Sequence, residues 1–323
     1  KYLTTYTVRL IATDSARMAT ELLLQTGPEA HLAEIGFLPT QIIQSEEDFY
    51  RDKGLPFVLP ELRDLPLAAA LELDPKNLVS PKHIKGCIHA HSTWSDGVHS
   101  IQEMAESCIQ LGYEYLAITD HSRSASYARG LSIEQVMQQH EEIDILNEKL
   151  KPFRIFKGIE SDILYDGNLD YPETVLEKFD LVVASVHSVL RMDIQKATSR
   201  IVSALSNPFT TLLGHPSGRL LLSREGYPLD YEAILQEASK NQVVLELNAN
   251  RFRMDIDWRH IPRCLSLGLM VSVNPDAHQK ESIGDMFNGI AIARKGGLCK
   301  EMLFNGFSLQ EMENWLQKRK KRE

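Results

Sequence analysis

Residues 84–278 repeat one pattern of hydrophobic and polar positions seven times. In each repeat, a short run of β-branched or other apolar residues ends in a polar residue, and in several repeats a segment with helical spacing follows. The seven runs are IKGCIHAH, YEYLAITDH, RIFKGIESD, LVVASVH, TTLLGHP, VVLELNAN and LMVSVNPDAH. Short apolar runs of this kind are typical of buried strands. The pattern therefore predicts seven strands that alternate with helices.

Three of the intervening segments have clear helical spacing and a residue that can cap the helix. They are SIQEMAESCIQLG, SIEQVMQQHEEIDILNEKL and DYEAILQEASKN. Ser100 and Ser132 can cap the first two, and Glu103 follows Ser100 at capping-box spacing. Asp230 can cap the third. Helices between strands serve as crossovers, so we expect the strands to pair in parallel.

So many strand–helix units within about 240 residues favour a closed or nearly closed barrel over an open sheet. The sequence before residue 84 differs, because YTVRLIATDSARMATELLLQTG predicts a strand, a loop and a helix that ends at Gly27. Residues 61–83 contain prolines and a short Ala/Leu helix, as in a connector. We therefore predict an α/β protein with a small N-terminal α/β part over residues 1–60, a linker over 61–83 and a barrel domain over 84–323.

The composition of the 323 residues, 43% hydrophobic and 24% charged, is ordinary for a soluble globular protein. We find no apolar run long enough to cross a bilayer and no signal peptide. The four cysteines form no CxxC pair, which argues against a structural zinc finger and suits a reducing cytoplasm. We therefore predict a cytoplasmic protein without a membrane partner, and a chain that opens on Lys1 instead of methionine indicates a piece of a longer protein.

The formal net charge of −9 has two interpretations. One is an acidic, solvated surface, which most soluble enzymes have, and the other is a carboxylate-rich site that binds cations. The charge disfavours a general nucleic-acid-binding surface but leaves room for a local basic groove.

Most of the predicted strands end beside residues that can bind a metal ion. In chain order these candidates are His89, His91, Asp96, His121, Glu160, His187, His215, Asp276 and His278. One histidine at a strand end is more often a satisfied polar residue than a ligand, but six gathered at one barrel mouth need partners. His89 and His91 stand two apart, so we expect them to point to the same face of a strand. Imidazole and carboxylate suit zinc, manganese or iron, and nine ligands exceed the needs of one ion, so we predict two or three divalent ions.

The motifs around these residues resemble those of the PHP (polymerase and histidinol phosphatase) superfamily. The matching segments are HAHSTWSDG, AITDHS, GIESDIL, ASVHS, GHPSGRLLLSREGYPLD, ELNAN with DIDWR, and NPDAH. Over residues 84–323 they most resemble the version at the C-terminus of bacterial family X DNA polymerases. TELLLQTGPEAHLAEIG is similar to the thumb segment of those polymerases, and GLPFVLPELRD to the linker that follows. The upstream palm carboxylates are missing, so we expect no polymerase activity from this chain.

The resemblance implies a distorted seven-stranded (βα)7 barrel that holds three ions. It assigns His89, His91, Glu160 and Asp276 to the first ion, Glu160, His187 and His215 to the second, and Asp96, His121 and His278 to the third. It also implies a metal-dependent 3′-5′ exonuclease or 3′-end phosphodiesterase that acts on DNA in repair, since paired ions activate water and offset phosphate charge. Two alternatives stay open. One is a small-molecule phosphomonoesterase resembling histidinol phosphatase, and the other is a non-catalytic module that the ions stabilise.

Three arginines are candidates to contact a phosphate group, namely Arg219, Arg253 and Arg123. The planar guanidinium group matches phosphate oxygens, although a surface ion pair explains each arginine at least as well. Asp162 follows Glu160 by two residues and could orient a ligand, unless it is a solvent-facing loop carboxylate. Asn248 and Asn250 are suited to hydrogen bonding. The sequence predicts nothing about the oligomeric state.

Overall fold

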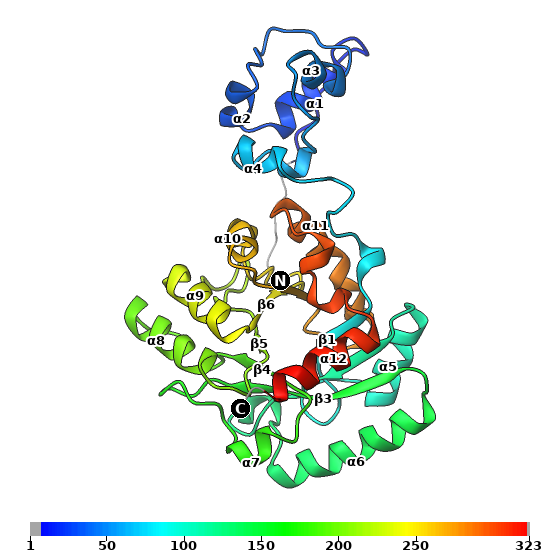
Figure 1. Ribbon diagram of the computed structural model, residues 1–323, viewed down its shortest axis with the longest axis vertical. Coiled ribbons are helices and arrows are strands. Elements are labelled where there is room, and N and C mark those ends of the chain that lie inside the picture. The colour runs from blue at the N-terminus through cyan, green and yellow to red at the C-terminus, as the bar shows by residue number, and fades with distance from the viewer. Residues whose placement is uncertain (1–7, 322–323) are drawn as a thin grey trace. The chain divides into compact units, whose positions relative to one another are not determined.

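A computed structural model of the chain describes residues 8–321, which divide into two compact units between Lys76 and Asn77. The larger unit contains one sheet of seven parallel strands in chain order (Figure 1). The strands are β1 (Gly86–Ala90), β2 (Tyr115–Ile118), β3 (Arg154–Asp162), β4 (Leu181–Ser185), β5 (Leu212–Leu213), β6 (Val244–Asn248) and β7 (Val271–Asn274). A parallel bridge between Ala90 and Ala277 joins the first strand to the segment after the last. The predicted α/β fold with a nearly closed seven-stranded barrel is therefore confirmed.

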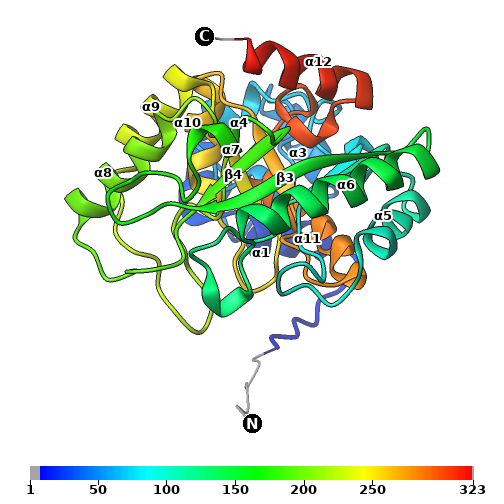
Figure 2. The same cartoon turned by 90° about the horizontal axis from the view of Figure 1, so that it is seen from below.

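Helices follow each strand and cover the outside of the barrel (Figures 1 and 2). They are α5 (Ile101–Gln110), α6 (Ile133–Lys149), α7 (Glu173–Leu176), α8 (Ile194–Leu205), α9 (Tyr231–Asn241), α10 (Ile261–Ser266) and, after β7, α11 (Met286–Lys295). The last helix, α12 (Leu309–Lys320), instead packs against apolar residues inside the barrel. The predicted caps are present. Ser100 and Ser132 each accept a hydrogen bond from the backbone of the third helical residue, and Asp230 does the same for α9. The crossover helices explain the parallel pairing.

The barrel strands separate two hydrophobic clusters. Leu116 and Ile155 belong to an outer cluster with the helices, whereas Tyr115 and Phe156 point inwards. The inner cluster also includes Met312 and Leu316 of α12, while the inward positions nearer the carboxyl ends of β3, β6 and β7 are polar and buried. The interior thus changes from apolar to polar along the strands, and this change places the functional site at the carboxyl ends.

The described part of the smaller unit, residues 8–76, is helical. It contains α1 (Met18–Thr26), α2 (Glu29–Glu34), α3 (Glu46–Asp52), the 3₁₀ turn η1 (Pro60–Leu62) and α4 (Leu67–Leu71). The predicted helix that ends at Gly27 is confirmed, and α4 is the expected Ala/Leu helix. The boundary between the units falls inside the segment that we expected to be a linker.

The predicted N-terminal strand is wrong for residues 8–12, which form no strand, while its first residues lie outside the described part. Val8 and Leu10 are 77% and 90% exposed. Residues 8–76 offer no neighbouring strand to pair with, so alternation alone does not produce a sheet there. The N-terminal α/β part is, over the described residues, an all-helical unit. Across residues 8–321, no helix is both long and apolar enough to span a bilayer.

Candidate metal centre

His89 reaches the barrel mouth through an irregularity in β1. The strand register shifts between Cys87 and Ala90, and both of these residues pack in the outer cluster, whereas Ile88 packs inside. Regular alternation would send His89 outwards with Cys87. The bulge, with a φ of 71° at His89, turns the imidazole inwards, where its ring centroid lies 5.3 Å from that of His91. The two imidazoles are together as expected, but simple alternation is not the reason.

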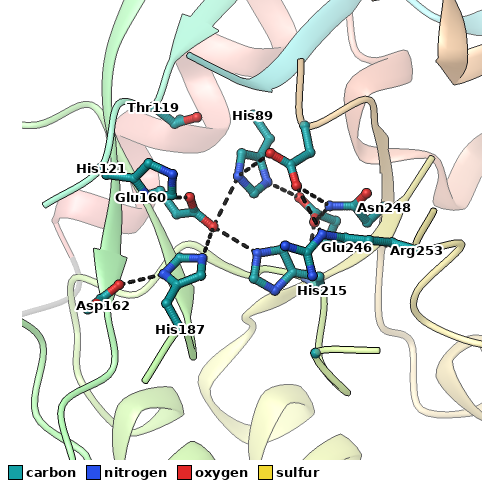
Figure 3. Close-up of polar contacts among 12 residues, drawn as sticks. His89, Thr119, His121, Glu160, Asp162, His187, His215, Glu246, Asn248 and Arg253 are labelled. Carbon is teal, nitrogen blue, oxygen red and sulfur yellow. Dashed lines mark hydrogen bonds and ion pairs between the residues drawn. The ribbon is translucent and has the colours of Figure 1, made fainter. Parts of the chain in front are cut away.

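Glu160, at the carboxyl end of β3, lies at the centre of the cluster (Figure 3). Its Oε1 atom lies 3.2 Å from Nε2 of His89, 3.2 Å from Nε2 of His187 and 2.9 Å from Nε2 of His215. Its Oε2 atom lies 3.0 Å from Nδ1 of His121. Burial alone would raise the pKa of Glu160, but the imidazoles, first of all His187, hold that pKa well below its usual value. One carboxylate therefore connects histidines from several strands.

All nine predicted ligands lie in this cluster. Four groups of side chains bring potential ligand atoms within 4.8 Å of one another: His91, Asp96, His121 and His278; His89, Glu160 and His215; His89, His91 and Asp276; and His121, Glu160 and His187. Six of the seven strands, all except β6, contribute at or just after their carboxyl ends, so residues far apart in sequence meet at one mouth. The groups share members, which is the arrangement expected for neighbouring ions with common ligands.

The polar atoms of the cluster test whether metal ions fit. Five buried atoms make no hydrogen bond, although some of them lie close together, because their directions do not suit one: His89 Nε2, His91 Nδ1, His121 Nδ1, Glu160 Oε2 and His215 Nδ1. A buried polar atom left unpaired costs about 1–3 kcal/mol, and native proteins contain few of them. Coordination of divalent cations by these imidazoles and carboxylates would remove that cost. The donor set, which contains no thiolate, fits zinc, manganese or iron.

The charges in the cluster also favour cations. Although burial lowers the pKa of His187, the carboxylates of Glu160 and Asp162 raise it to about 10. Burial and the neighbouring imidazoles of His278 and His121 lower the pKa of His91 to about 3. Imidazoles of one cluster are thus forced into opposite protonation states when only protons balance the carboxylates. Divalent cations can replace those protons as the positive charge of the site.

Carboxylates behind two of the imidazoles hold the rings in place. Nδ1 of His89 lies 2.6 Å from Oε2 of Glu246, and Nδ1 of His187 lies 2.5 Å from Oδ1 of Asp162 (Figure 3). Such partners fix the tautomer and orientation of a metal-binding imidazole. The structure thus brings Asp162 to a ligand as expected, whereas our sequence reasoning missed Glu246. The sequence feature that could have indicated Glu246 is its position two residues before Asn248, which puts both side chains on the same face of a strand.

Asp120 is a second residue that sequence reasoning missed. Its buried carboxylate accepts hydrogen bonds from the backbone and hydroxyl of Ser92, from the hydroxyl of Ser95 and from the amide of Gln139. These bonds hold the loop that carries Asp96 against the end of β2. The signal in the sequence was a carboxylate directly before His121, at the end of an apolar run.

Three of the candidate ligands have a strained backbone conformation. His89, His215 and Asp276 have φ angles of 71°, 23° and 50°, in the left-handed region that residues with a Cβ atom avoid. Each such residue costs about 1–3 kcal/mol and persists only where its surroundings hold it. The backbone amide of His215 donates to Glu246, and the carbonyl of His89 accepts from Ala277. Strain held in this way is typical of functional sites.

Of the three predicted arginines, Arg253 contacts the cluster, with Nε 3.3 Å from Oδ2 of Asp276. Arg219 instead donates to the carbonyl groups of Arg253 and Met254 and pairs with Asp257, so it fastens loops together. Arg123 donates to the carbonyl of Asp170 and has a side chain that is 56% exposed.

Of the two predicted asparagines, one lies in the cluster and the other does not. Asn248 donates to Glu246 and Asp276 within the cluster. Asn250 accepts a bond from the amide of Phe252 and supports its own loop.

Comparison with known proteins identifies the family. The sequence model of the PHP domain matches residues 88–250, half of the chain, and this segment includes seven of the nine candidate ligands. The chain belongs to the PHP family. The ligands Asp276 and His278 follow the matched segment, at the end of the last strand of the PHP barrel.

Relatives of this PHP chain have two kinds of name. "DNA polymerase/3'-5' exonuclease PolX" of Bacillus subtilis is 42% identical over 274 residues, which cover 85% of this chain and 48% of that protein. The chain thus spans about half the length of this relative. A "probable phosphatase" of a Thermoanaerobacter species is 26% identical over 245 residues, which cover 72% of this chain and 95% of that protein.

A solved structure supports the fold alone. A Listeria monocytogenes protein that carries the name of a histidinol phosphatase matches with a TM-score of 0.52 and 14% identity, over 62% of this chain and 97% of that chain. The likeness agrees with the PHP barrel described above.

Proposed function

We propose that this metal-dependent PHP phosphoesterase hydrolyses phosphodiester bonds at the 3′ ends of DNA, and so removes nucleotides or blocking groups during repair. The observation that carries the proposal is the convergence of nine imidazole and carboxylate side chains around Glu160. The similarity to a polymerase with a 3′-5′ exonuclease supports DNA as the substrate. We also propose that the protein acts in the cytoplasm.

We assign three divalent ions to the nine side chains in the way that the family resemblance implies. Nε2 atoms of His89 and His91 lie 3.6 and 3.2 Å from the same oxygen of Asp276, which supports one shared ion. His187 and His215 both face Oε1 of Glu160, which supports a second. Asp96, His121 and His278 form the third set, with Oδ1 of Asp96 lying 3.6 and 3.3 Å from the two imidazoles. When bound, such ions lower the pKa of water and offset the charge of a phosphate group.

The chain's own residues bind and orient the phosphate ester. Arg253 lies beside Asp276 with its side chain 17% exposed, so its guanidinium can donate to phosphate oxygens that do not react. Glu246 and Asp162 hold His89 and His187 in fixed orientations, and so keep the ligand atoms directed at the centre of the cluster.

A second candidate function keeps the chemistry and changes the substrate to a small phosphate monoester. The match to relatives named as phosphatases, over 72% of this chain and nearly their whole length, favours it. We prefer DNA because the relative with the higher identity, 42%, has a name that includes exonuclease activity.

Turnover of two substrates separates these functions. With manganese present, we expect the chain to shorten a 3′-recessed DNA duplex much faster than it hydrolyses histidinol phosphate. The reverse preference would establish the small-molecule function. His89→Ala should abolish hydrolysis of both substrates while the circular dichroism spectrum stays native, and full activity in that variant would rule out the site.

A further inference from the structure

Four segments near the mouth of the barrel have a charge unlike that of the rest of the chain. They are residues 122–131, 186–192, 214–229 and 249–254, which follow β2, β4, β5 and β6 and which we call the loop rim. The loop rim contains seven arginines, no lysine and one acidic residue, Glu225, whereas the whole chain has 35 basic and 44 acidic residues. Arginine is less strongly hydrated than lysine and contacts phosphate through two parallel donors. The rim segments therefore carry a net positive charge on an acidic protein, although Asp170, Asp257 and Asp276 outside them pair with Arg123, Arg219 and Arg253.

The loop rim also exposes large apolar side chains. Tyr127, Val189, Leu222 and Phe252 are 68%, 52%, 96% and 55% exposed. Phe252 carries a stacked cation, because the guanidinium carbon of Arg251 lies 5.1 Å from its ring centroid. Exposed aromatic rings beside arginines are the combination with which proteins bind single-stranded nucleic acids, since every base has a face that can stack.

Contacts place the loop rim around the metal centre. The ring of Tyr127 lies 6.0 Å from that of His121 and 6.3 Å from that of His187. The amide of Leu221 donates to the carbonyl of Phe252 at 2.6 Å, which joins the loops after β5 and β6. Arg253, in the second of these loops, reaches Asp276. A strand that enters the cluster from the side of these loops therefore passes over the rim.

We propose that the loop rim binds the single-stranded 3′ end of the DNA substrate, with Tyr127 and Phe252 stacking on bases and Arg251 and Arg253 contacting phosphates. The proposal rests on the proposed function, since it assigns the strand-binding surface of the same site. A single DNA strand suits the rim in two respects. Its phosphates complement the charge of the arginines, and its bases can stack on the exposed aromatic rings. Tyr127, beside the ligands, is placed for the base nearest the cleaved bond. Phe252 and Leu222 are placed for bases further from it.

Binding of a fluorescent oligothymidylate of about 12 nucleotides, followed by anisotropy with the metal-loaded chain, tests the rim. A phosphorothioate at the 3′ linkage slows hydrolysis during the measurement. We expect the double variant Leu222→Ala/Phe252→Ala to weaken binding at least about tenfold. The control Ile145→Ala removes an apolar side chain that is 69% exposed in the C-terminal half of α6, outside the four rim segments, and should bind like the wild type.

The salt dependence tests the arginines separately. Arg251→Ala should reduce the slope of log Kd against log salt concentration by about 0.7, because one phosphate contact is lost. Arg263→Ala, which removes an exposed arginine paired with Glu232 on the outer helices, should leave the slope unchanged. A blunt duplex that binds as tightly as the single strand would overturn the proposal, since its bases are already stacked.

The rim and the proposed function fail in different ways. Tight binding without any cleavage of an unmodified oligonucleotide would support the rim and contradict the proposed function. Cleavage of that oligonucleotide, with equal Kd values for the wild type and the rim variants, would overturn the rim and leave the function standing.

Discussion

Nδ1 of His89 lies 2.6 Å from Oε2 of Glu246, in the buried layer beneath the cluster. The same carboxylate accepts bonds from the side-chain amides of Asn248 and Asn274 and from the backbone of His215. Because Nδ1 is occupied, Nε2 of His89 is directed at Glu160 and Asp276. Glu246 therefore supports two candidate ligands at once.

Glu246→Gln should lower metal affinity and phosphoesterase activity about 10–100-fold, since loss of the carboxylate frees the imidazole of His89 to turn. Calorimetric titration of the metal-free variant with zinc measures the affinity. Glu232→Gln, on the exposed face of α9, is the matched control and should behave like the wild type. Unchanged metal affinity in Glu246→Gln would show that the contact has no part in holding ions.

Asp162→Asn should also lower phosphoesterase activity, because Asp162 holds the imidazole of His187. The asparagine keeps the bond from the hydroxyl of Ser124 but removes the charge that holds the His187 ring 2.5 Å away. We expect kcat to fall about 10–100-fold with the fold intact. Asp166→Asn, at an exposed position in the following loop, controls for the loss of charge. Equal kcat values for both variants would contradict this role of Asp162.

Asp120→Ala should destabilise the larger unit. The substitution leaves the amide of Ser92, the hydroxyl of Ser95 and the amide of Gln139 without their shared acceptor. Unpaired buried donors of this kind reduce the free energy of unfolding by about 2–4 kcal/mol. Urea unfolding measures the change, and a loss below about 0.5 kcal/mol would mean that the loop is held in some other way.

His140 gives the chain a pH dependence outside the metal centre. The pKa of His140 is lowered from 6.5 to about 4, mainly because the imidazole is buried. The charged groups that face it are Lys157, Asp180, Asp144 and Lys178, and its ring packs against Phe179. The unfolded chain takes up a proton near pH 6.5 and the folded chain near pH 4, so the stabilisation is present above pH 6.5 and is lost as the pH falls to 4.

The variant His140→Gln should therefore lose less stability than the wild type on acidification. Between pH 6.5 and 4, we expect the free energy of unfolding of the wild type to fall by up to about 3 kcal/mol more than that of the variant. Urea unfolding at several pH values measures the difference. Parallel curves for the two proteins would mean that His140 titrates normally.

The barrel and the convergence of the candidate ligands were predictable for one physical reason. Each apolar run is followed by a crossover segment, so the strands pair in parallel and their carboxyl ends converge. A histidine such as His121 or His215 at the end of a run is then carried to the common mouth. The turn of His89 was not predictable, because the bulge that directs it depends on pairing with β2.

The supporting residues were harder to predict than the candidate ligands. Glu246 contacts His89, which lies 157 residues away in the sequence. Asp120 accepts hydrogen bonds from residues of a loop and of a helix. Nothing local marks such partners beyond a carboxylate in an apolar run. The expected strand near Leu10 was instead predicted where none forms. An alternating segment forms no strand when no neighbouring strand can pair with it.

The most direct test of the metal centre is elemental analysis of the purified chain after incubation with zinc, manganese or iron salts and dialysis. We expect two or three divalent ions per folded wild-type chain, and the loss of at least one in Glu160→Gln, because this carboxylate contacts histidines on both of its oxygens. A folded wild-type chain that retains no ion with any of the three metals would contradict the metal centre.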